Sequence, residues 1–129
     1  PGLHLLLAED NELNSEIATA LLEEQGASIT AVENGRLALE AIQNAAPRTY
    51  DAILMDVMMP EMNGLEATRC IRAFEGKGPG EGTPIIAMTA NVFADDVKAC
   101  LDAGMNSHVG KPLDMKVLIG EILKYTDAR

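Results

Sequence analysis

Three carboxylates and two further polar residues stand at the ends of apolar stretches in this sequence. Glu9 and Asp10 follow "LLLA", and Asp56 follows "AILM". Thr89 follows "IIAM", and Lys111 comes after the short segment "SHVG". Continuous apolar runs are typical of buried parallel strands, and ligand sites of open parallel sheets lie outside the carboxyl ends of the strands. The sequence therefore predicts that these five residues meet at one edge of a sheet.

The chemistry of such a group follows from its charges. Two carboxylates about 4 Å apart repel each other by roughly 4 kcal/mol at an effective dielectric constant near 20, so three of them require a cation or shifted pKa values. Oxygen ligands without a nearby His or Cys favour Mg²⁺ over a transition metal. One Mg²⁺ ion and Lys111 would neutralise the three carboxylates and attract a phosphoryl group. Lys111 and the Thr89 hydroxyl could hold two of its oxygens, and Asp56 is the expected nucleophile, which would form an aspartyl phosphate.

Each of these residues also has an ordinary structural interpretation when it is taken alone. Glu9 and Asp10 could form a solvated turn, with Asp10 as a helix cap. Asp56 and Thr89 could cap the segments that follow them, and Lys111 could be an exposed cation. These interpretations do not explain why three carboxylates share one edge, and we therefore prefer a common site.

The elements that must position these residues alternate along the chain as strand and helix. The predicted strands are Leu3–Ala8, Ser28–Val32, Asp51–Asp56, Pro84–Met88 and Ser107–Val109. The first, third and fourth are continuously apolar and are expected to be central, whereas the other two are expected at the edges. Each strand is followed by a segment of helical period, and right-handed crossovers then predict an α/β fold, a (βα)5 doubly wound open parallel sheet.

The apolar faces of the helical segments predict which of their side chains enter the core. In chain order, the predicted faces are Leu13, Ile17, Ala20 and Leu21, ending near Gly26; Ala38, Ala41, Ile42 and Ala45, ended by Pro47; Ala67, Ile71 and Phe74; Val97, Cys100 and Leu101, with Gly104 just after the helix; and Met115, Leu118, Ile119 and Ile122 after Pro112. The longest loop, 75–82, is rich in glycine.

Composition limits the function classes. A chain of 129 residues, 47% of them hydrophobic, fits one compact domain. A net charge of −10 argues against direct nucleic-acid binding, because phosphate backbones attract clusters of Lys and Arg. No apolar run approaches the roughly 20 residues of a membrane span, and no secretory signal precedes the first strand. Cys70 and Cys100 lack CxxC spacing and are expected to be reduced thiols of a cytoplasmic protein.

The sequence as a whole resembles the receiver domain of two-component response regulators. The similarity extends from "LLLAEDN" through "YDAILMDVMMPEMNGLEATRCIR" and "IIAMTAN" to "AGMNSHVGKPLD". It implies a flavodoxin-like sheet in the order 2-1-3-4-5 and a phosphoacceptor module of a phosphorelay in signal transduction. The donor would be a histidine kinase or a histidine phosphotransfer domain. The module would catalyse its own aspartyl phosphorylation and dephosphorylation without being an enzyme in the usual sense.

The resemblance also implies a role for each matching position. Asp56 matches the phosphoacceptor, and Glu9 and Asp10 match the acidic pair of a Mg²⁺ (or Mn²⁺) site. In the family, the second acidic residue and the phosphoacceptor bind the ion directly, together with a backbone carbonyl that here belongs to Met58. Lys111 matches the lysine that contacts the phosphoryl group.

Four further positions match the switch and lifetime-tuning residues of the family. Thr89 matches the hydroxyl that moves toward the phosphoryl group. His108 stands where Phe or Tyr is usual, so it is expected to be a weaker hydrophobic lever and to respond to pH; the alternative is a half-buried polar residue on an edge strand. Met58 and Asn91 match tuners of phosphoryl lifetime, and their alternatives are packing in a loop and capping of a helix.

The segment "MTANVFADDVKACLDAGMNSHVGKPLD" is similar to receivers fused to hybrid sensor histidine kinases, and the chain does not begin with Met. We therefore expect residues 1–129 to be a single receiver domain cut from a longer chain, itself a histidine kinase that could be membrane-anchored. The domain is expected to be a monomer or a weak dimer.

Three other functions can be compared with these residues. A Mg²⁺-dependent aspartyl phosphatase normally has a second Asp two residues after its nucleophile, where Met58 stands here. A flavin- or nucleotide-binding module would need a Gly- or Ser/Thr-rich loop after the first strand, where this chain has "AEDNELN". A receiver-like interaction domain that is never phosphorylated would not require all five site positions to be filled.

Overall fold

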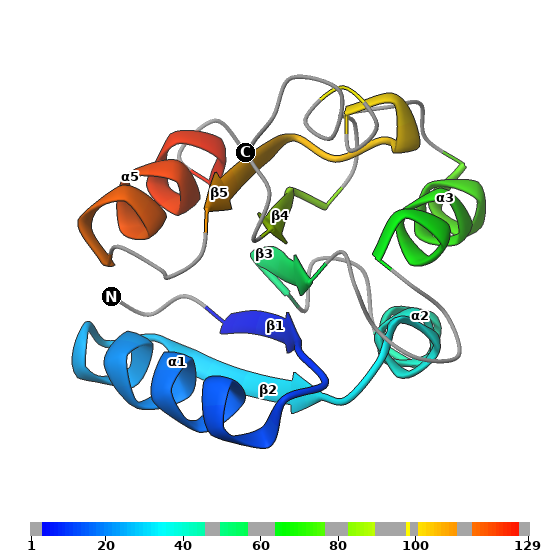
Figure 1. Ribbon diagram of the computed structural model, residues 1–129. Helices are drawn as coiled ribbons and strands as arrows, with labels where there is room; N and C mark the ends of the chain where they lie inside the picture. Colours follow the sequence, from blue (N-terminus) through cyan, green and yellow to red (C-terminus); the bar gives the residue numbers. More distant parts are fainter. Residues whose placement is uncertain are drawn as a thin grey trace.

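In the computed structural model, the described part of the chain comprises residues 4–45, 50–56, 64–76, 83–89, 98, 101–110 and 115–126. Its strands are β1 (His4–Ala8), β2 (Ser28–Val32), β3 (Ala52–Asp56), β4 (Ile85–Thr89) and β5 (Ser107–Gly110). All of them pair in parallel and form one sheet in the order β2-β1-β3-β4-β5 (Figure 1). The predicted α/β class and strand order are confirmed, and each strand bound within the described residues lies within one residue of its prediction.

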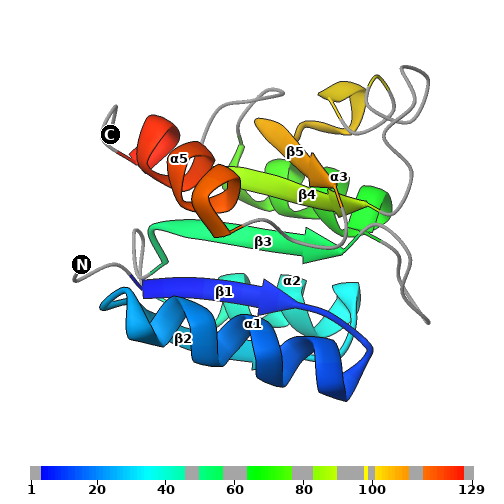
Figure 2. The same ribbon diagram turned by 60° about the vertical axis from the view of Figure 1, so that its left-hand side comes forward.

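Helices cover both faces of this sheet. The described helices are α1 (Glu12–Glu24), α2 (Gly35–Gln43), α3 (Gly64–Glu75) and α5 (Met115–Thr126). In Figure 2, α1 and α5 lie in front of the sheet, and α2 and α3 lie behind it. This is the doubly wound arrangement expected from right-handed crossovers. None of the helices in the described ranges combines the length and the apolar character that crossing a membrane requires.

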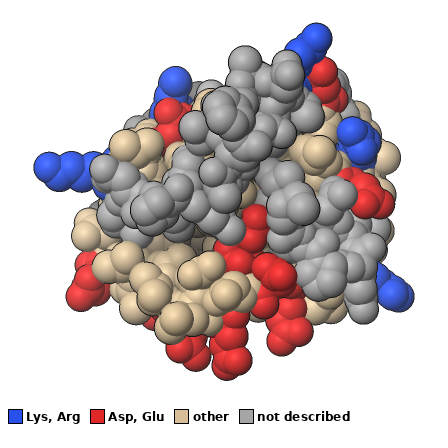
Figure 3. Space-filling model, in the orientation of Figure 1, with Lys and Arg blue, Asp and Glu red and all other residues tan. Residues whose placement is uncertain are grey.

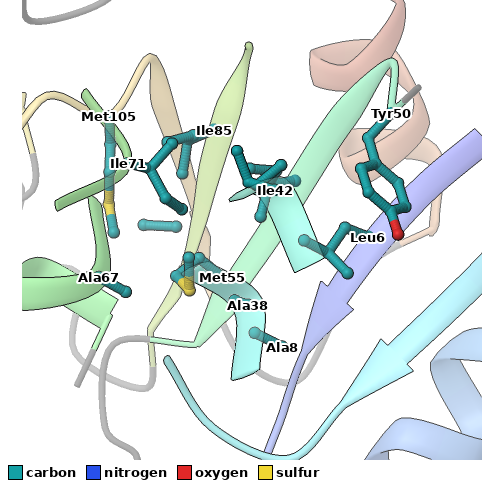
Figure 4. Packing of buried hydrophobic residues seen from close by; sticks show 12 residues of the cluster. Leu6, Ala8, Ala38, Ile42, Tyr50, Met55, Ala67, Ile71, Ile85 and Met105 are labelled. Atoms are coloured by element: carbon teal, nitrogen blue, oxygen red, sulfur yellow. The ribbon is translucent and has the colours of Figure 1, made fainter. Parts of the chain in front are cut away.

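The two faces of the sheet form two separate hydrophobic cores. On the side of α2 and α3, Ile53 and Met55 of β3 belong to one core. Figure 4 shows Met55 in this core together with Ile71 and Ile42. On the side of α1 and α5, Leu54 packs in the other core. Because successive residues of a strand point to opposite faces and helices cover both faces, every position of β3 is buried, and the four residues before Asp56 are apolar. This explains the unbroken run that precedes Asp56.

The predicted core face of α1 is wrong. Leu13, Ile17 and Leu21 are 63%, 50% and 38% exposed, and Ala20 is exposed as well. The helix instead turns Ala18 and Leu22 toward the sheet. These two residues lie one position further along the helix, a rotation of about 100°. The buried stripe is the less apolar of the two, so periodicity alone selects the wrong one.

The other predicted helix faces are correct in part. Ala38, Ile42, Ala67, Ile71, Leu118 and Ile122 are buried as expected, and Ala41, Ala45 and Ile119 are half-buried. Helix α2 ends at Gln43, earlier than the predicted end at Pro47. Phe74 and Leu101 were placed in the core and are exposed. In the last turn of α3, Arg72 occupies the inward position and Phe74 points to solvent.

Predictions for Gly104 and Cys70 can be compared with the structure, whereas those for several other residues cannot. Gly104 has φ +117°, as expected for the residue that ends a helix. Cys70 of α3 is a free, half-buried thiol. The following lie outside the described residues: Leu3, Pro47, Val97, Cys100, Pro112, the side chain of Met115 and most of the 75–82 loop.

Candidate functional site

The end of β1 delivers two carboxylates to the carboxyl edge of the sheet, the edge at which the strands end. The Glu9 amide donates to the Val32 carbonyl oxygen at 3.1 Å, which extends the pairing of β1 with β2 by one residue. Asn11 then caps α1, because its side-chain oxygen accepts from the Asn14 amide at 3.0 Å. The interpretation of Asp10 as the helix cap is therefore wrong.

Asp56 comes to the same edge as the last residue of β3. Strand β3 pairs directly with β1, so Asp56 ends beside Glu9 and Asp10. One carboxylate oxygen from each of these three residues lies within 4.8 Å of the others. Glu9 and Asp56 are only 5% and 4% exposed, whereas Asp10 is exposed. We call these three residues the acidic cluster, and the structure brings them together as predicted.

The donor set of the acidic cluster fits a hard divalent cation. All three ligand atoms are carboxylate oxygens, which Mg²⁺ and Mn²⁺ prefer over softer metals. Two of the carboxylates are buried, where repulsion between like charges is less screened than in water. Figure 3 shows further acidic side chains around and below the centre of this face, over the end of β1 and along α1. The surface therefore favours the approach of cations.

The backbone register places Thr89 at the same edge. Asp56 pairs with Met88 of β4, and Thr89 is the next residue and the last of its strand. Thr89 in turn pairs with Gly110, the last residue of β5, which immediately precedes Lys111 in the chain. The side chain of Thr89 and all of Met58, Asn91 and Lys111 lie outside the described residues.

His108 is a half-buried residue of the edge strand β5. It pairs with Ala87, whose side chain belongs to the core on the side of α2 and α3. Paired residues of parallel strands point to the same face, so His108 faces that side of the sheet. Its location is compatible with both of its predicted interpretations, and its role as a switch remains a prediction.

Gly64 also contacts this site; it lies in the segment "YDAILMDVMMPEMNGLEATRCIR" that carries the family resemblance, but no role was assigned to it from the sequence. It is the first residue of α3, and it lies directly against the backbone of Asp56. The available signal was a glycine at the start of a helix, eight residues after the expected nucleophile, where a residue with higher helix propensity would be usual.

A model of the response regulator receiver domain matches residues 5–123. The chain belongs to this family. The receiver domain is 41% identical to a probable histidine kinase 1 of Oryza sativa subsp. indica, over 87% of this chain and 14% of that protein. It is 38% identical to the sensor protein GacS of Pseudomonas syringae pv. syringae, over 95% of this chain and 13% of that protein. The chain thus spans about a seventh of the length of these relatives.

Solved structures agree with this family assignment. The receiver domain of the sensor histidine kinase PA1611 of Pseudomonas aeruginosa PAO1 aligns with a TM-score of 0.85 and 37% identity, covering 98% of this chain and 99% of that one. That structure contains a magnesium ion coordinated in the active-site cleft. A chain of the Saccharomyces cerevisiae complex of Ypd1, a histidine phosphotransfer protein, with the receiver domain of Ssk1 aligns with a TM-score of 0.86 and 27% identity, covering 98% and 90%.

Proposed function

We propose that this receiver domain accepts a phosphoryl group on Asp56 from a phosphohistidine donor, in a Mg²⁺-dependent step of a phosphorelay. The observation that carries the proposal is the acidic cluster, in which a buried aspartate at the end of β3 lies beside two carboxylates from the end of β1. A cluster of one sign of charge attracts a cation, and the cation then allows an anionic phosphoryl group to approach.

Each site residue has a proposed task in this step. The acidic cluster and the Met58 carbonyl would hold Mg²⁺ or Mn²⁺, and the bound ion would offset charge on the phosphoryl oxygens. A carboxylate oxygen of Asp56 attacks phosphorus and forms the new O–P bond, while the N–P bond breaks and its electron pair returns to the donor imidazole. Lys111 and the Thr89 hydroxyl hold the remaining oxygens.

The consequences of phosphorylation also involve named residues. The new charge would draw the Thr89 hydroxyl toward the phosphoryl group, and His108 on the neighbouring strand would respond to that movement. Met58 and Asn91, which flank Asp56 and Thr89 in sequence, would set how long the aspartyl phosphate survives. Asp56 is phosphorylated once and must lose the phosphoryl group before it can accept another. The domain therefore acts as a signalling module that catalyses chemistry only on its own side chain.

The exposed apolar face of α1 supports a docking place for the donor. Leu13, Ile17 and Leu21 form a solvent-exposed stripe that begins three residues after Asp10. Helix α1 also carries four Glu residues and no Lys or Arg. We therefore propose a donor surface with an apolar centre and a basic rim, supplied by a histidine kinase or a histidine phosphotransfer domain.

The domain organisation is part of the same proposal. The relatives that match this chain are sensor and histidine kinases several times its length. We propose that residues 1–129 form a single receiver domain of a longer hybrid histidine kinase. The isolated domain would be a monomer or a weak dimer, with its site in the cytoplasm.

A mass measurement tests the proposed function. The protein is incubated with acetyl phosphate, with and without Mg²⁺, and the intact mass is recorded. We expect a gain of one phosphoryl group that requires Mg²⁺ and is lost in Asp56→Asn. An unlabelled wild-type protein, under conditions that label another receiver domain, would contradict the proposal, and so would equal labelling of Asp56→Asn.

A further inference from the structure

The first residue of α3 has no room for a side chain because the backbone of Asp56 lies against it. A Cβ atom built on Gly64 would overlap the Asp56 carbonyl oxygen and lie 3.0 Å from both the Asp56 carbonyl carbon and Met55 Cγ. The carbonyl group is backbone, and Met55 is fully buried in the core. Neither neighbour can move away without displacing β3 or repacking the core.

Position 64 requires glycine because of the limited space, and not because of its backbone dihedral angles. The described glycines with positive φ are Gly26, Gly76 and Gly104, and Gly64 is not among them. The carbonyl oxygen of Gly64 accepts a bond from the buried Thr68 hydroxyl at 2.7 Å. Gly64 is therefore bonded to Thr68 through its carbonyl oxygen, and the Asp56 backbone occupies the space that a side chain of residue 64 would need.

We propose that Gly64 is a positioning residue for the Asp56 carboxylate, since it allows α3 to begin in direct contact with the Asp56 backbone. The Asp56 carbonyl and side chain share one Cα atom. A side chain at position 64 would push that carbonyl and turn the carboxylate away from Glu9 and Asp10. Because the acidic cluster depends on distances below 5 Å, a small rotation weakens its affinity for a cation. This inference rests on the proposed function of the cluster.

The test compares the Mg²⁺ affinity of Gly64→Ala with that of two matched glycine variants, measured by calorimetric titration of folded protein. Gly104→Ala is the destabilised control, because its Cβ would approach Arg72 Cγ to 2.9 Å at the opposite edge of the sheet and its φ is positive. Gly120→Ala is the neutral control, because nothing lies within 4 Å of its Cβ. We expect an affinity at least tenfold weaker in Gly64→Ala only, although Gly104→Ala also melts at a lower temperature.

The other outcomes are equally decisive. Affinity of folded Gly64→Ala within twofold of wild type overturns the inference, and so does an equal loss of affinity in Gly104→Ala, which would indicate general destabilisation. If Gly64→Ala does not fold, the variant Thr68→Val tests the inference instead. This change removes the hydrogen bond to the Gly64 carbonyl oxygen without adding bulk. We expect about threefold weaker binding in Thr68→Val, and unchanged binding would overturn the inference. A wild-type protein that neither binds Mg²⁺ nor is labelled by acetyl phosphate would instead refute the proposed function.

Discussion

The carboxyl and amino edges of the sheet differ in how their buried charged groups are surrounded. At the carboxyl edge, the acidic cluster gathers three groups of the same sign, two of them buried. At the amino edge, the buried Arg72 is surrounded by acceptors from the two segments that enter β4 and β5. Like charges held together attract a cation, whereas the guanidinium of Arg72 is matched by acceptors of the chain itself. The first arrangement is therefore suited to binding an ion, and the second to stabilising the fold.

All three nitrogen atoms of the Arg72 guanidinium group donate hydrogen bonds within the protein. Its Nε donates to the Gly104 carbonyl oxygen at 2.9 Å, and Nη1 donates to the Thr83 carbonyl oxygen at 2.8 Å. Nη1 also pairs with Glu75 at 3.0 Å, and Nη2 donates to Asn106 at 2.9 Å. We call Arg72, Glu75, Thr83 and Asn106 the arginine clasp. It ties the end of α3 to the segments that enter β4 and β5.

The largest expected effect on stability is at the arginine clasp. Arg72→Met should lower the free energy of unfolding by about 3–5 kcal/mol, because it removes the cationic partner of the mostly buried Glu75 carboxylate and the guanidinium donor of two carbonyl oxygens. Urea denaturation measures this loss. The folded variant should still be labelled by acetyl phosphate at low temperature, since the clasp lies at the other edge of the sheet.

Arg36→Met is the matched control for this variant. Arg36 pairs with Glu40 at 3.2 Å on the surface of α2, with most of its side chain exposed. Such pairs contribute only about 0.3–0.5 kcal/mol, because water and salt screen them. If Arg36→Met and Arg72→Met lower the free energy of unfolding by similar amounts, buried and exposed ion pairs do not differ in this protein as we expect. Loss of labelling in folded Arg72→Met would show that the two edges are coupled.

Mg²⁺ should stabilise the protein through the carboxyl edge alone. At a free Mg²⁺ concentration 100 times the Kd, binding to the native state adds about 2.7 kcal/mol to the free energy of unfolding. Arg72→Met should gain the same increment as wild type. Asp10→Asn should gain less, because one carboxylate ligand is gone. Thermal unfolding in Mg²⁺ and in EDTA measures these increments, and a full increment in Asp10→Asn would place the ion elsewhere.

The smallest expected effect concerns α1, which borders the acidic cluster. Ile17→Lys should slow transfer from a phosphorylated histidine phosphotransfer domain about tenfold, or about 1.4 kcal/mol. The change removes an exposed apolar contact and adds a charge of the sign that we propose for the donor rim. Labelling by acetyl phosphate should not change, because that small molecule does not need the helix face.

Phe74→Lys is the control for Ile17→Lys. Phe74 is also an exposed apolar residue, but it lies on α3, on the other side of the sheet. Stopped-flow or quench measurements of phosphoryl transfer compare the two variants. If Phe74→Lys slows transfer as much as Ile17→Lys does, the donor does not distinguish the faces, and the proposed docking place is wrong.

Local patterns predicted much of the fold and of the candidate site. The apolar runs before Glu9 and Asp56 identified central strands, because a strand covered on both faces must be apolar throughout. The carboxyl ends of parallel strands lie at one edge, so the acidic cluster could be predicted before any distance was known. The same rule brings Thr89 to that edge, as the backbone register shows.

Patterns within one helix could not decide which apolar stripe would be buried. On α1, the more apolar stripe with Leu13 and Ile17 stays exposed, and the stripe with Ala18 and Leu22 packs on the sheet. Periodicity describes a helix alone, whereas burial depends on how closely its backbone approaches the strands beneath. The same limitation placed Phe74 in the core, where Arg72 lies instead.

The sequence by itself determined the order of the elements, the central strands and the acidic residues at their ends, because these depend on the alternation and the composition of neighbouring residues. Only the tertiary structure decided that Arg72 meets Thr83, Gly104 and Asn106, which are 11, 32 and 34 residues away in the chain. It also decided that the Asp56 backbone excludes a side chain at Gly64. Contacts of this kind depend on the packing of distant segments, and no local pattern records them.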